Sequence, residues 1–292
     1  MRRRMNLEDT LFNVFNYSAL TLVAIATVYP FVWITSASFS HPSSVLGGKV
    51  WLLPVQFSTE AYRHILRYNM LWVAYANTIF YVVVGTTLNV ALTMMAAYPL
   101  SRTWFYGRGI ITFIIVFTMF FSGGMIPSYI LMRWLGLLDT RWAMILPGAV
   151  SAWNLLVARA YLQANIPDEL VEAAAVDGAS DLQTLVRIVF PLSLPVVAVL
   201  TLFYAVGHWN QFFNAIIYLR TRELMPLQVI LREIVVSLQM NEVLADVVGQ
   251  RSLLQETVKY ATIIVATAPI LCLYPFLQKY FIKGILLGSL KG

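Results

Sequence analysis

The segment Glu172-Ala173-Ala174-Ala175-Val176-Asp177-Gly178, followed by Ile188 and Pro191, decides the fold class of this chain. It is a polar stretch, and the apolar stretches on both sides of it are long enough to cross a bilayer as helices. A simple membrane anchor has no need of a structured acidic hairpin between two spans. The segment therefore indicates a membrane protein that meets a partner outside the lipid.

Local signals predict the first helix of this hairpin. Pro167 suits the start of a helix, and the two acidic residues after it favour the positive end of the helix dipole. We expect this helix over Asp168–Asp177, with Gly178 supplying the left-handed stop. Ala173–Ala175 make one flank of the helix thin, so it can lie deep in a groove of another protein.

A second short helix is predicted after the glycine. Ser180 and, three positions later, Gln183 form the sequence pattern of a capping box, and Pro191 limits the end of the helix. Glu172 and Asp177 can give charge-assisted hydrogen bonds to basic groups of a partner. The alternative interpretation of the whole hairpin is an ordinary, well-capped loop.

Composition points to lipid as the solvent of most of the chain. Of its 292 residues, 59% are hydrophobic and only 12% are charged, against about 25% charged in soluble domains. The mean hydropathy is +0.72. The net charge is +6, and the basic residues lie mostly at the ends of apolar stretches, which suits anionic lipid headgroups better than nucleic acid. Cys272 is the one cysteine, so no disulfide forms within the chain.

Stretches without Asp, Glu, Lys or Arg indicate the number of spans. Crossing the hydrocarbon core takes about 20 apolar residues as a helix, so each stretch has room for about one span. The sequence therefore predicts an all-α membrane protein, a single transmembrane domain over 1–292 with six transmembrane helices and the hairpin between helices 4 and 5. The stretches are Leu11–Gly48, Tyr68–Ser101, Gly109–Met132, Trp142–Ala158, Ile188–Leu219 and Tyr260–Gln278.

The orientation is predicted from the first span. Arg2, Arg3 and Arg4 precede it, whereas the next basic residue after it is Lys49. The Lys and Arg residues divide evenly between the two sides, but the first helix usually dominates, so we expect both termini in the cytoplasm. The hairpin segment at about 163–191 is then inside, and the outside segments lie at about 39–70, 133–141 and 220–258.

Two of these features have alternative interpretations. The first span could be a signal peptide with a cleavable Ser36-Ala37-Ser38, but its apolar region exceeds the usual length of about 7–15 residues, so we expect a retained helix. In the third outside segment, Leu227–Met240 has apolar residues at helical spacing. This stretch is either a helix on the membrane surface or a docking element for an external partner.

Polar residues within the spans are candidates for lining a pathway. Aromatic faces together with amides and hydroxyls can line a path for a polar solute, and such residues cluster in the fourth and fifth spans. The alternative is ordinary hydrogen bonding between helices. His208 has no second His, Cys or acid beside it, so we expect no metal site. The candidates are Trp153, Asn154, Trp209, Asn210 and Asn214.

The spacing of Glu172-Ala173-Ala174, Gly178, Ile188 and Pro191 resembles the signature loop of bacterial ABC importer permeases. The wider string Glu-Ala-Ala-Ala-Val-Asp-Gly-Ala resembles the carbohydrate-uptake branch, relatives of the maltose permease G subunit. The resemblance extends over most of the chain. It covers Ala97–Arg102, Phe121–Pro127, Leu135–Thr140, Trp209–Phe213, Lys283-Gly284, Gly288-Ser289 and Lys291-Gly292.

The resemblance implies a bacterial inner-membrane permease that pairs with a second, similar permease as a heterodimer. Two ATPase subunits would dock on the cytoplasmic hairpins, and an extracytoplasmic binding protein would deliver a sugar or oligosaccharide, including acidic ones such as alginate or pectin fragments. An importer of polyamine or phosphate is the alternative within the same class. The residues implied for the ATPase contact are Glu172, Ala173, Ala174, Asp177, Gly178, Ile188 and Pro191.

The residues themselves agree with a permease that has no ATPase site of its own. The chain has no Gly-x-x-x-x-Gly-Lys phosphate loop, so ATP and Mg would be bound by the partner subunits, with no cofactor in this chain. An intramembrane enzyme needs a catalytic pair within spans, and a proton-coupled carrier needs titratable groups near the midplane. The predicted spans contain no acidic residue.

Overall fold

The computed structural model of the chain describes residues 7–248 and 254–289, with side chains described over 11–238 and 254–272. This part of the chain is helical, and its β structure is limited to one isolated bridge between Ser40 and Phe57. The all-α prediction is therefore confirmed for the described residues. Arg2–Arg4 and the terminal Lys291-Gly292, which entered the predictions above, lie outside them.

The chain divides into two compact units. The first comprises Met1–Asn69 and Leu231–Ala268, and contains α1 (Leu7–Ser38), α2 (Pro42–Leu46) and α3 (Glu60–Leu66). The segment after α1 folds back on the end of that helix, where Trp33 Nε1 donates to the carbonyl of Val50 (3.0 Å) and Ser36 Oγ to that of Leu52 (2.6 Å).

The second unit comprises Met70–Ile230 and Pro269–Gly292. Its main rod is one helical run, Asn69–Ser101, of 33 residues. A π-helical segment, η1, interrupts the α-helical pattern of this rod. The rod is made of α4 (Asn69–Phe80), η1 (Tyr81–Gly85) and α5 (Thr86–Ser101).

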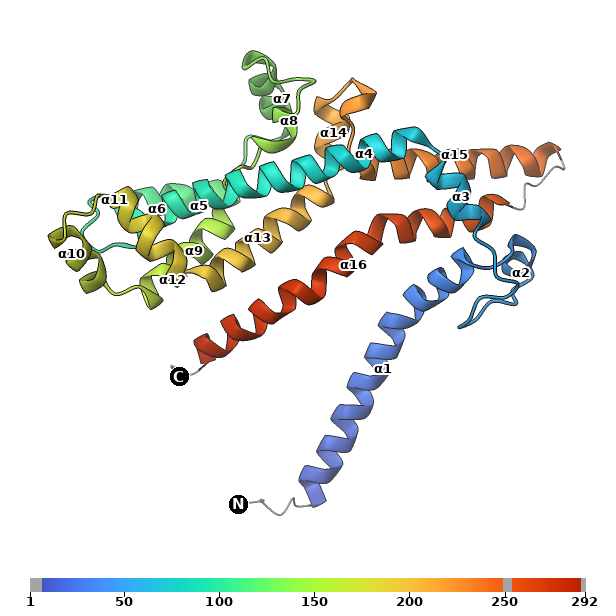
Figure 1. The fold of residues 1–292 in the computed structure, drawn as a ribbon, viewed down its shortest axis with the longest axis horizontal. Helices are drawn as coiled ribbons and strands as arrows, with labels where there is room; N and C mark the ends of the chain where they lie inside the picture. Colours follow the sequence, from blue (N-terminus) through green and yellow to red (C-terminus); the bar gives the residue numbers. More distant parts are fainter. Residues whose placement is uncertain (1–6, 249–253, 290–292) are drawn as a thin grey trace. The chain divides into compact units, whose positions relative to one another are not determined.

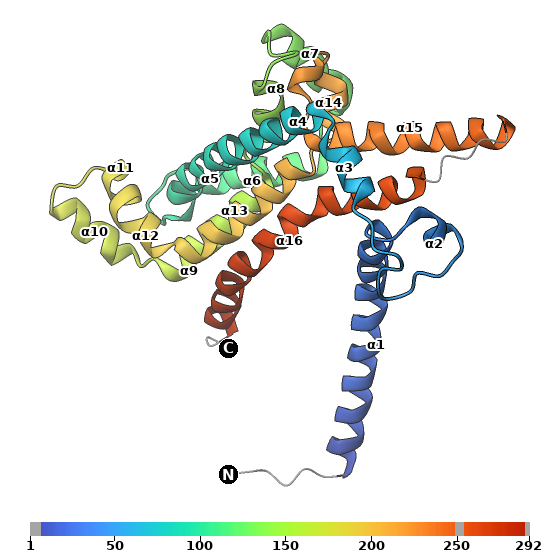
Figure 2. The ribbon, with the colours of Figure 1, turned by 45° about the vertical axis from the view of Figure 1, so that its right-hand side comes forward.

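Among the remaining elements of the second unit, two helices make the most extensive contacts with the rod (Figures 1 and 2). Those two helices are α9 (Ala152–Asn165) and α13 (Leu194–Trp209). The other elements are α6 (Arg108–Phe120), α7 (Met125–Trp134), α8 (Trp142–Ile145), α10 (Asp168–Val176), α11 (Asp181–Thr184), the π-helical η2 (Leu185–Val189), α12 (Phe190–Leu192), α14 (Phe213–Tyr218) and the 3₁₀ turn η3 (Arg222–Leu224).

Two long helices contribute to both units. They are α15 (Leu227–Val248) and α16 (Leu254–Ser289). The helix predicted from Leu227 is therefore present, and it runs beyond Met240. Its first turn is fixed to the rod, because the backbone N–H of Leu227 donates to Thr78 Oγ1 at 2.8 Å and the Leu227 side chain is buried.

The core of the second unit lies between α5, α9 and α13. Met94, Leu162 and Leu200, one from each helix, have almost no exposed surface. Burial of three such side chains stabilises the packing by about 1.5–3 kcal/mol each in water, and dispersion between the same atoms holds the helices together in lipid. This packing makes α5, α9 and α13 one frame that carries the short elements at its two ends.

The number of spans agrees only in part with the predicted six. Among the described residues, Leu11–Ser38 and Asn69–Ser101 are long and apolar enough to cross a membrane as single helices. Two further candidates are bent pairs: α6 with α7, at 115°, and Asp181–Leu192 with α13, at 87°. α9 has 14 residues, fewer than the roughly 20 that a full span needs. The count of six stays a prediction.

Candidate functional site

The polar hairpin lies at one end of the second unit (Figure 1). α10 begins after Pro167 and ends at Val176, one residue before the predicted end. Gly178 has a φ of 81°, the left-handed conformation that favours glycine. The N–H of Gly178 donates to Ala175 (3.0 Å) and that of Ala179 to Ala174 (2.9 Å), the two bonds of a Schellman motif.

The second half of the hairpin begins with the predicted capping box. Ser180 Oγ accepts from the N–H of Gln183 (3.4 Å), and the Ser180 N–H donates to Gln183 Oε1 (3.0 Å). The helical run from Ser180 is not uniform, because the π-helical η2, which contains Ile188, separates α11 from α12. It continues one residue past Pro191, to Leu192, and then bends by 87° into α13.

Burial divides the predicted hairpin residues into two groups. Ala174 is 5% exposed and packs inward with Val171, and Ile188 is half-buried. The outward group also includes Val176, an apolar side chain that is 87% exposed at the tip of α10. The exposed predicted residues are Glu172, Ala173, Asp177, Gly178 and Pro191.

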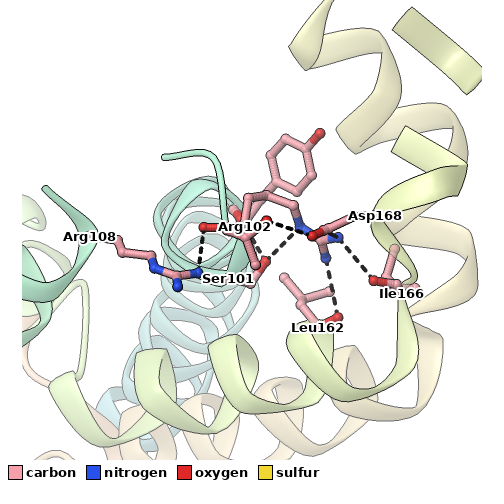
Figure 3. A network of polar contacts seen from close by, with 8 residues as sticks. Ser101, Arg102, Arg108, Leu162, Ile166 and Asp168 are labelled. Atoms are coloured by element: carbon pink, nitrogen blue, oxygen red, sulfur yellow. Dashed lines mark hydrogen bonds and ion pairs between the residues drawn. The ribbon is translucent and has the colours of Figure 1, made fainter. Parts of the chain in front are cut away.

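A buried arginine fixes the hairpin to the end of α5 (Figure 3). Arg102 has no exposed surface, and its Nη1 donates to Asp168 Oδ1 at 2.8 Å and to the carbonyl of Ile166 at 2.9 Å. Its Nη2 donates to the carbonyl of Leu162 at 3.2 Å. Thr103 Oγ1 donates to the other carboxylate oxygen of Asp168 at 2.8 Å. The guanidinium thus joins three successive parts of the chain: the end of α9, its C-cap and the first turn of α10.

Two more arginines hold the backbone around Arg102. Arg108 Nη1 donates to the carbonyl of Arg102 at 3.0 Å, and Arg159 Nε donates to that of Leu100 at 2.9 Å. The first of these bonds lies within segment 100–108, and the second joins α9 to the end of α5. Neither Arg102 nor Asp168 is among the site residues predicted from the sequence. The sequence signals that could have indicated this pair are the position of Arg102 at the end of an apolar run and that of Asp168 at a predicted helix start.

An acidic residue joins two of the predicted outside segments. Asp139, at φ 58°, accepts from the N–H of Arg220 (2.8 Å), the N–H of Thr221 (2.8 Å) and Thr221 Oγ1 (2.6 Å). Its own N–H donates to the carbonyl of Tyr218 at 2.8 Å. The hydroxyl of Thr221 and the two backbone donors lower the pKa of the Asp139 carboxyl below its ordinary value.

A polar cavity of about 360 Å³ lies between α5, α9, α13 and α14. It is lined by Asn89, Ser151, Asn154, His208, Gln211 and Asn214, together with Phe203, Tyr204 and backbone of Pro147, Gly148 and Gly207. Asn89 Nδ2 lies 2.9 Å from His208 Nε2, and Thr93 Oγ1 lies 2.7 Å from the hydroxyl of Tyr204. These contacts tie α5 to α13 along the cavity.

The five candidates for lining a pathway are placed differently by the structure. Asn154 and Asn214 lie at the cavity. Trp153 is 60% exposed, Trp209 is buried with its ring edge-on to a neighbouring tyrosine, and Asn210 is exposed with its amide bonded to the carbonyl four residues back. Asn89, His208 and Gln211, which were not among the candidates, also line the cavity. No cluster of potential metal ligands occurs among the described residues.

Comparison with protein families gives a match over most of the chain. Residues 89–287 match the family described as "Binding-protein-dependent transport system inner membrane component". This range contains the hairpin, Arg102 and the whole lining of the polar cavity.

Individual relatives match along nearly their full lengths. The Polygalacturonan/rhamnogalacturonan transport system permease protein YtcP of Bacillus subtilis (strain 168) is 42% identical, over 98% of this chain and 100% of its own length. Protein LplC of Bacillus subtilis (strain 168) is 39% identical, over 97% of this chain and 95% of its own. One chain in the crystal structure of a bacterial ABC transporter involved in the import of the acidic polysaccharide alginate is 39% identical, with a TM-score of 0.87, covering 96% of this chain and 99% of that one.

Proposed function

The chain belongs to the family of binding-protein-dependent transport system inner membrane components, and we propose that it is the permease subunit of an ABC importer for acidic oligosaccharides. The relatives that support the substrate class are named for polygalacturonan and rhamnogalacturonan or come from a transporter of alginate. Each of these polymers contains carboxylated sugars. An importer of polyamine or phosphate is not favoured by these relatives.

The observation that carries the proposal is the hairpin with its anchor. A contact can couple ATP binding to transport only if it differs between the two states of the importer. A hairpin that transmits motion must also be fixed to the spans that it moves. Arg102 provides this connection, because its buried guanidinium binds the first turn of α10 and the end of α9 together. The outward face around Glu172 and Val176 is then the surface offered to the ATPase.

The partners follow from the same assignment. A separate ATPase supplies the energy and binds ATP and Mg, a second permease completes the pathway as a heterodimer, and an extracytoplasmic binding protein delivers the sugar. The proposed topology keeps six spans with both termini in the cytoplasm. It is supported by the contacts of Arg102 with segment 163–191 and of Asp139 with residues 220–221, since each joins segments predicted on the same side.

The predicted pathway residues stay part of the proposal, with different roles according to where the structure places them. Asn154 and Asn214 are the members that face a cavity, and the pathway is proposed to pass beside them. Trp153, with 60% of its surface exposed, is available to line a surface shared with the second permease.

The first experiment is to purify the tagged chain from its native membrane and identify the proteins that accompany it. An ATPase and a second permease are expected. Recovery of this chain alone, under conditions that keep membrane complexes intact, would make the hairpin an ordinary loop and refute the importer assignment.

Substitutions in the hairpin test the coupling role directly. Glu172→Lys and Gly178→Asp are each expected to abolish import of an oligogalacturonate while the chain stays in the membrane. Glu172→Gln is the matched control for shape, and Gly178→Asn the control for backbone, because asparagine tolerates the left-handed conformation better than most residues. Both controls should retain part of the import. Normal uptake by both charge-changing variants would contradict the coupling assignment.

A further inference from the structure

The polar cavity between α5, α9, α13 and α14 is lined by several carboxamides. Four carboxamides surround it, those of Asn89, Asn154, Gln211 and Asn214, and no charged side chain is among the residues that line it. Its volume of about 360 Å³ falls in the range of small-molecule sites, roughly 300–1,000 Å³. The cavity is therefore large enough for a ligand and selects against one that must be neutralised by an ion pair.

One lining group is buried without a hydrogen-bond partner. Asn89 is 2% exposed, and its Nδ2 is engaged with His208 Nε2 at 2.9 Å. Its Oδ1 has no partner in the described structure. Leaving such an acceptor unpaired costs about 1–3 kcal/mol, so a group from water or from a ligand is needed to satisfy it.

His208 beside it is held in one position with one ring nitrogen unused. With Asn89 Nδ2 donating to Nε2, the neutral ring carries its proton on Nδ1, and Nδ1 has no hydrogen-bond partner. A Cβ at Gly85 would lie 2.6 Å from Cε1 and 2.9 Å from Cδ2 of this ring, so glycine there makes room for it. The side chain of Gln211 lies beside the ring and interacts with it electrostatically. His208 Nδ1 and Gln211 Oε1 nevertheless form no hydrogen bond with each other.

The unsatisfied groups define the chemistry of a ligand. Gln211 Nε2 donates to the carbonyl of Met144 at 2.8 Å, which leaves Oε1 as a second free acceptor. Two acceptors, from Asn89 and Gln211, therefore accompany one donor, from His208. A hydroxyl donates one hydrogen bond and accepts others, so neighbouring sugar hydroxyls match this set. A carboxylate can only accept, and it would face the two amide oxygens with like partial charge.

We propose that this cavity is a subsite for the hydroxyl face of one sugar ring, formed by Asn89, His208 and Gln211. The subsite binds the hydroxyls of the ring and does not contact its carboxylate. This inference rests on the proposed function and deepens it, because it places a ligand-binding group in this permease subunit. The carboxylates of an acidic oligosaccharide are then recognised outside this cavity. Phe203, which is 43% exposed and lines the same cavity, offers an apolar surface for the face of the ring.

Protection of an introduced thiol tests the subsite. The chain has one cysteine, so Cys272→Ser gives a thiol-free background in this subunit. Into it go Asn214→Cys, at the cavity, and as the matched control Asn210→Cys, four residues earlier and outside the lining. The importer assembled with its partner subunits is treated with a small methanethiosulfonate reagent, with and without tetragalacturonate or its methyl ester. The modification is read from the mass of this subunit.

The expected result is that both sugars slow modification of Asn214→Cys by about tenfold and leave that of Asn210→Cys unchanged. Protection by the acid but not by its methyl ester would overturn the hydroxyl assignment, and equal protection of both thiols would overturn the location. Uptake of tetragalacturonate by the Cys272→Ser importer is measured in parallel. Absence of protection in an importer that takes up the sugar overturns the subsite alone, whereas an importer that takes up neither this sugar nor an alginate tetramer overturns the proposed function as well.

Discussion

Arg102 Nη1 lies 2.8 Å from Asp168 Oδ1, and this pair joins the C-cap residue of the long rod to the first turn of the hairpin. The arginine is fully buried and the aspartate side chain is 34% exposed, so the cation depends on its partners more than the anion does. The planar guanidinium bonds to two carbonyls and a carboxylate at once, which a lysine ammonium cannot do with the same geometry.

The first prediction concerns this pair. Asp168→Asn removes the negative charge that faces the buried guanidinium, a contribution of about 1.5–3 kcal/mol, while it keeps the shape of the side chain. We expect import to fall by about tenfold or more, because the hairpin is no longer fixed to α5. ATPase activity should lose its dependence on the loaded binding protein. Both are measured on the reconstituted importer.

Two companions make this prediction specific. Arg102→Lys should impair coupling at least as much as Asp168→Asn, because it keeps the charge and loses the fork of donors. Thr103→Val removes the bond to the other oxygen of Asp168 and should have a smaller effect. If Asp168→Asn imports at the normal rate, the pair has no part in coupling.

A second prediction separates docking from folding on α10. Ala173 is exposed and Ala174 is buried, although they are neighbours in the sequence. Ala173→Leu should fold normally but fill the surface offered to the ATPase, so the ATPase is lost from the purified complex. Ala174→Leu should instead reduce the amount of folded chain, because a buried position must accept three more carbons. Retention of the ATPase by Ala173→Leu would show that this flank is not the contact.

The third prediction concerns the close approach of Gly85 to His208. Ala at position 85 would push its Cβ into the imidazole, and overpacking of this kind costs about 1–3 kcal/mol. Gly85→Ala should therefore lower the thermal unfolding temperature of the purified complex. Gly207→Ala is the control, because a Cβ there meets nothing within 4 Å. Equal unfolding temperatures for the two variants would mean that the ring moves away at no cost.

A fourth prediction concerns pH at the Asp139 link. The hydroxyl and amide donors of Thr221 and the amide of Arg220 hold the pKa of the Asp139 carboxyl below its ordinary value of 3.8. A carboxyl with a lowered folded-state pKa stabilises the fold fully above its unfolded pKa and loses this contribution as pH falls through its folded pKa. Protection of the Arg220 and Thr221 amides from hydrogen exchange should thus persist at neutral pH and fall below about pH 4.

Asp139→Asn isolates the charge in this experiment. Asparagine tolerates the left-handed backbone at this position, where φ is 58°, and it keeps one acceptor oxygen. In Asp139→Asn, the amides of Arg220 and Thr221 should be less protected from hydrogen exchange at neutral pH. Their protection should show no further loss specific to the acid range. An acid-range loss of the same size in Asp139→Asn would assign the pH dependence to another group.

The hairpin could be predicted almost residue by residue because its signals are local. Gly178 ends the first helix, and Ser180 with Gln183 caps the second, all within six positions of one another. Arg102 could not be assigned in this way, since its partner Asp168 is 66 residues away and any of several acids could have met it. The spans were also read as straight segments, and apolar composition does not record the bends of 115° and 87°.

The cavity shows the same division between local and long-range information. Asn154 and Asn214 could be chosen as polar residues in apolar stretches. That Asn89 meets His208 depends on the register of α5 against α13, which no single stretch encodes. Trp209 was a candidate for its aromatic face, but it packs against Tyr75 instead.

The π-helical segment η2 has a consequence for the direction of everything that follows the hairpin. A π turn holds an additional residue compared with an α turn, and each residue of an α-helix advances its side chain by about 100° around the axis. Val189, the last residue of this segment, is buried. A π turn takes up its extra residue within one widened turn, so deleting one residue within Leu185–Val189 and restoring a regular α-helix would leave Pro191 and the start of α13 in nearly the same direction relative to the capping box. The π segment therefore lets this run hold one residue more without turning the spans away from the hairpin.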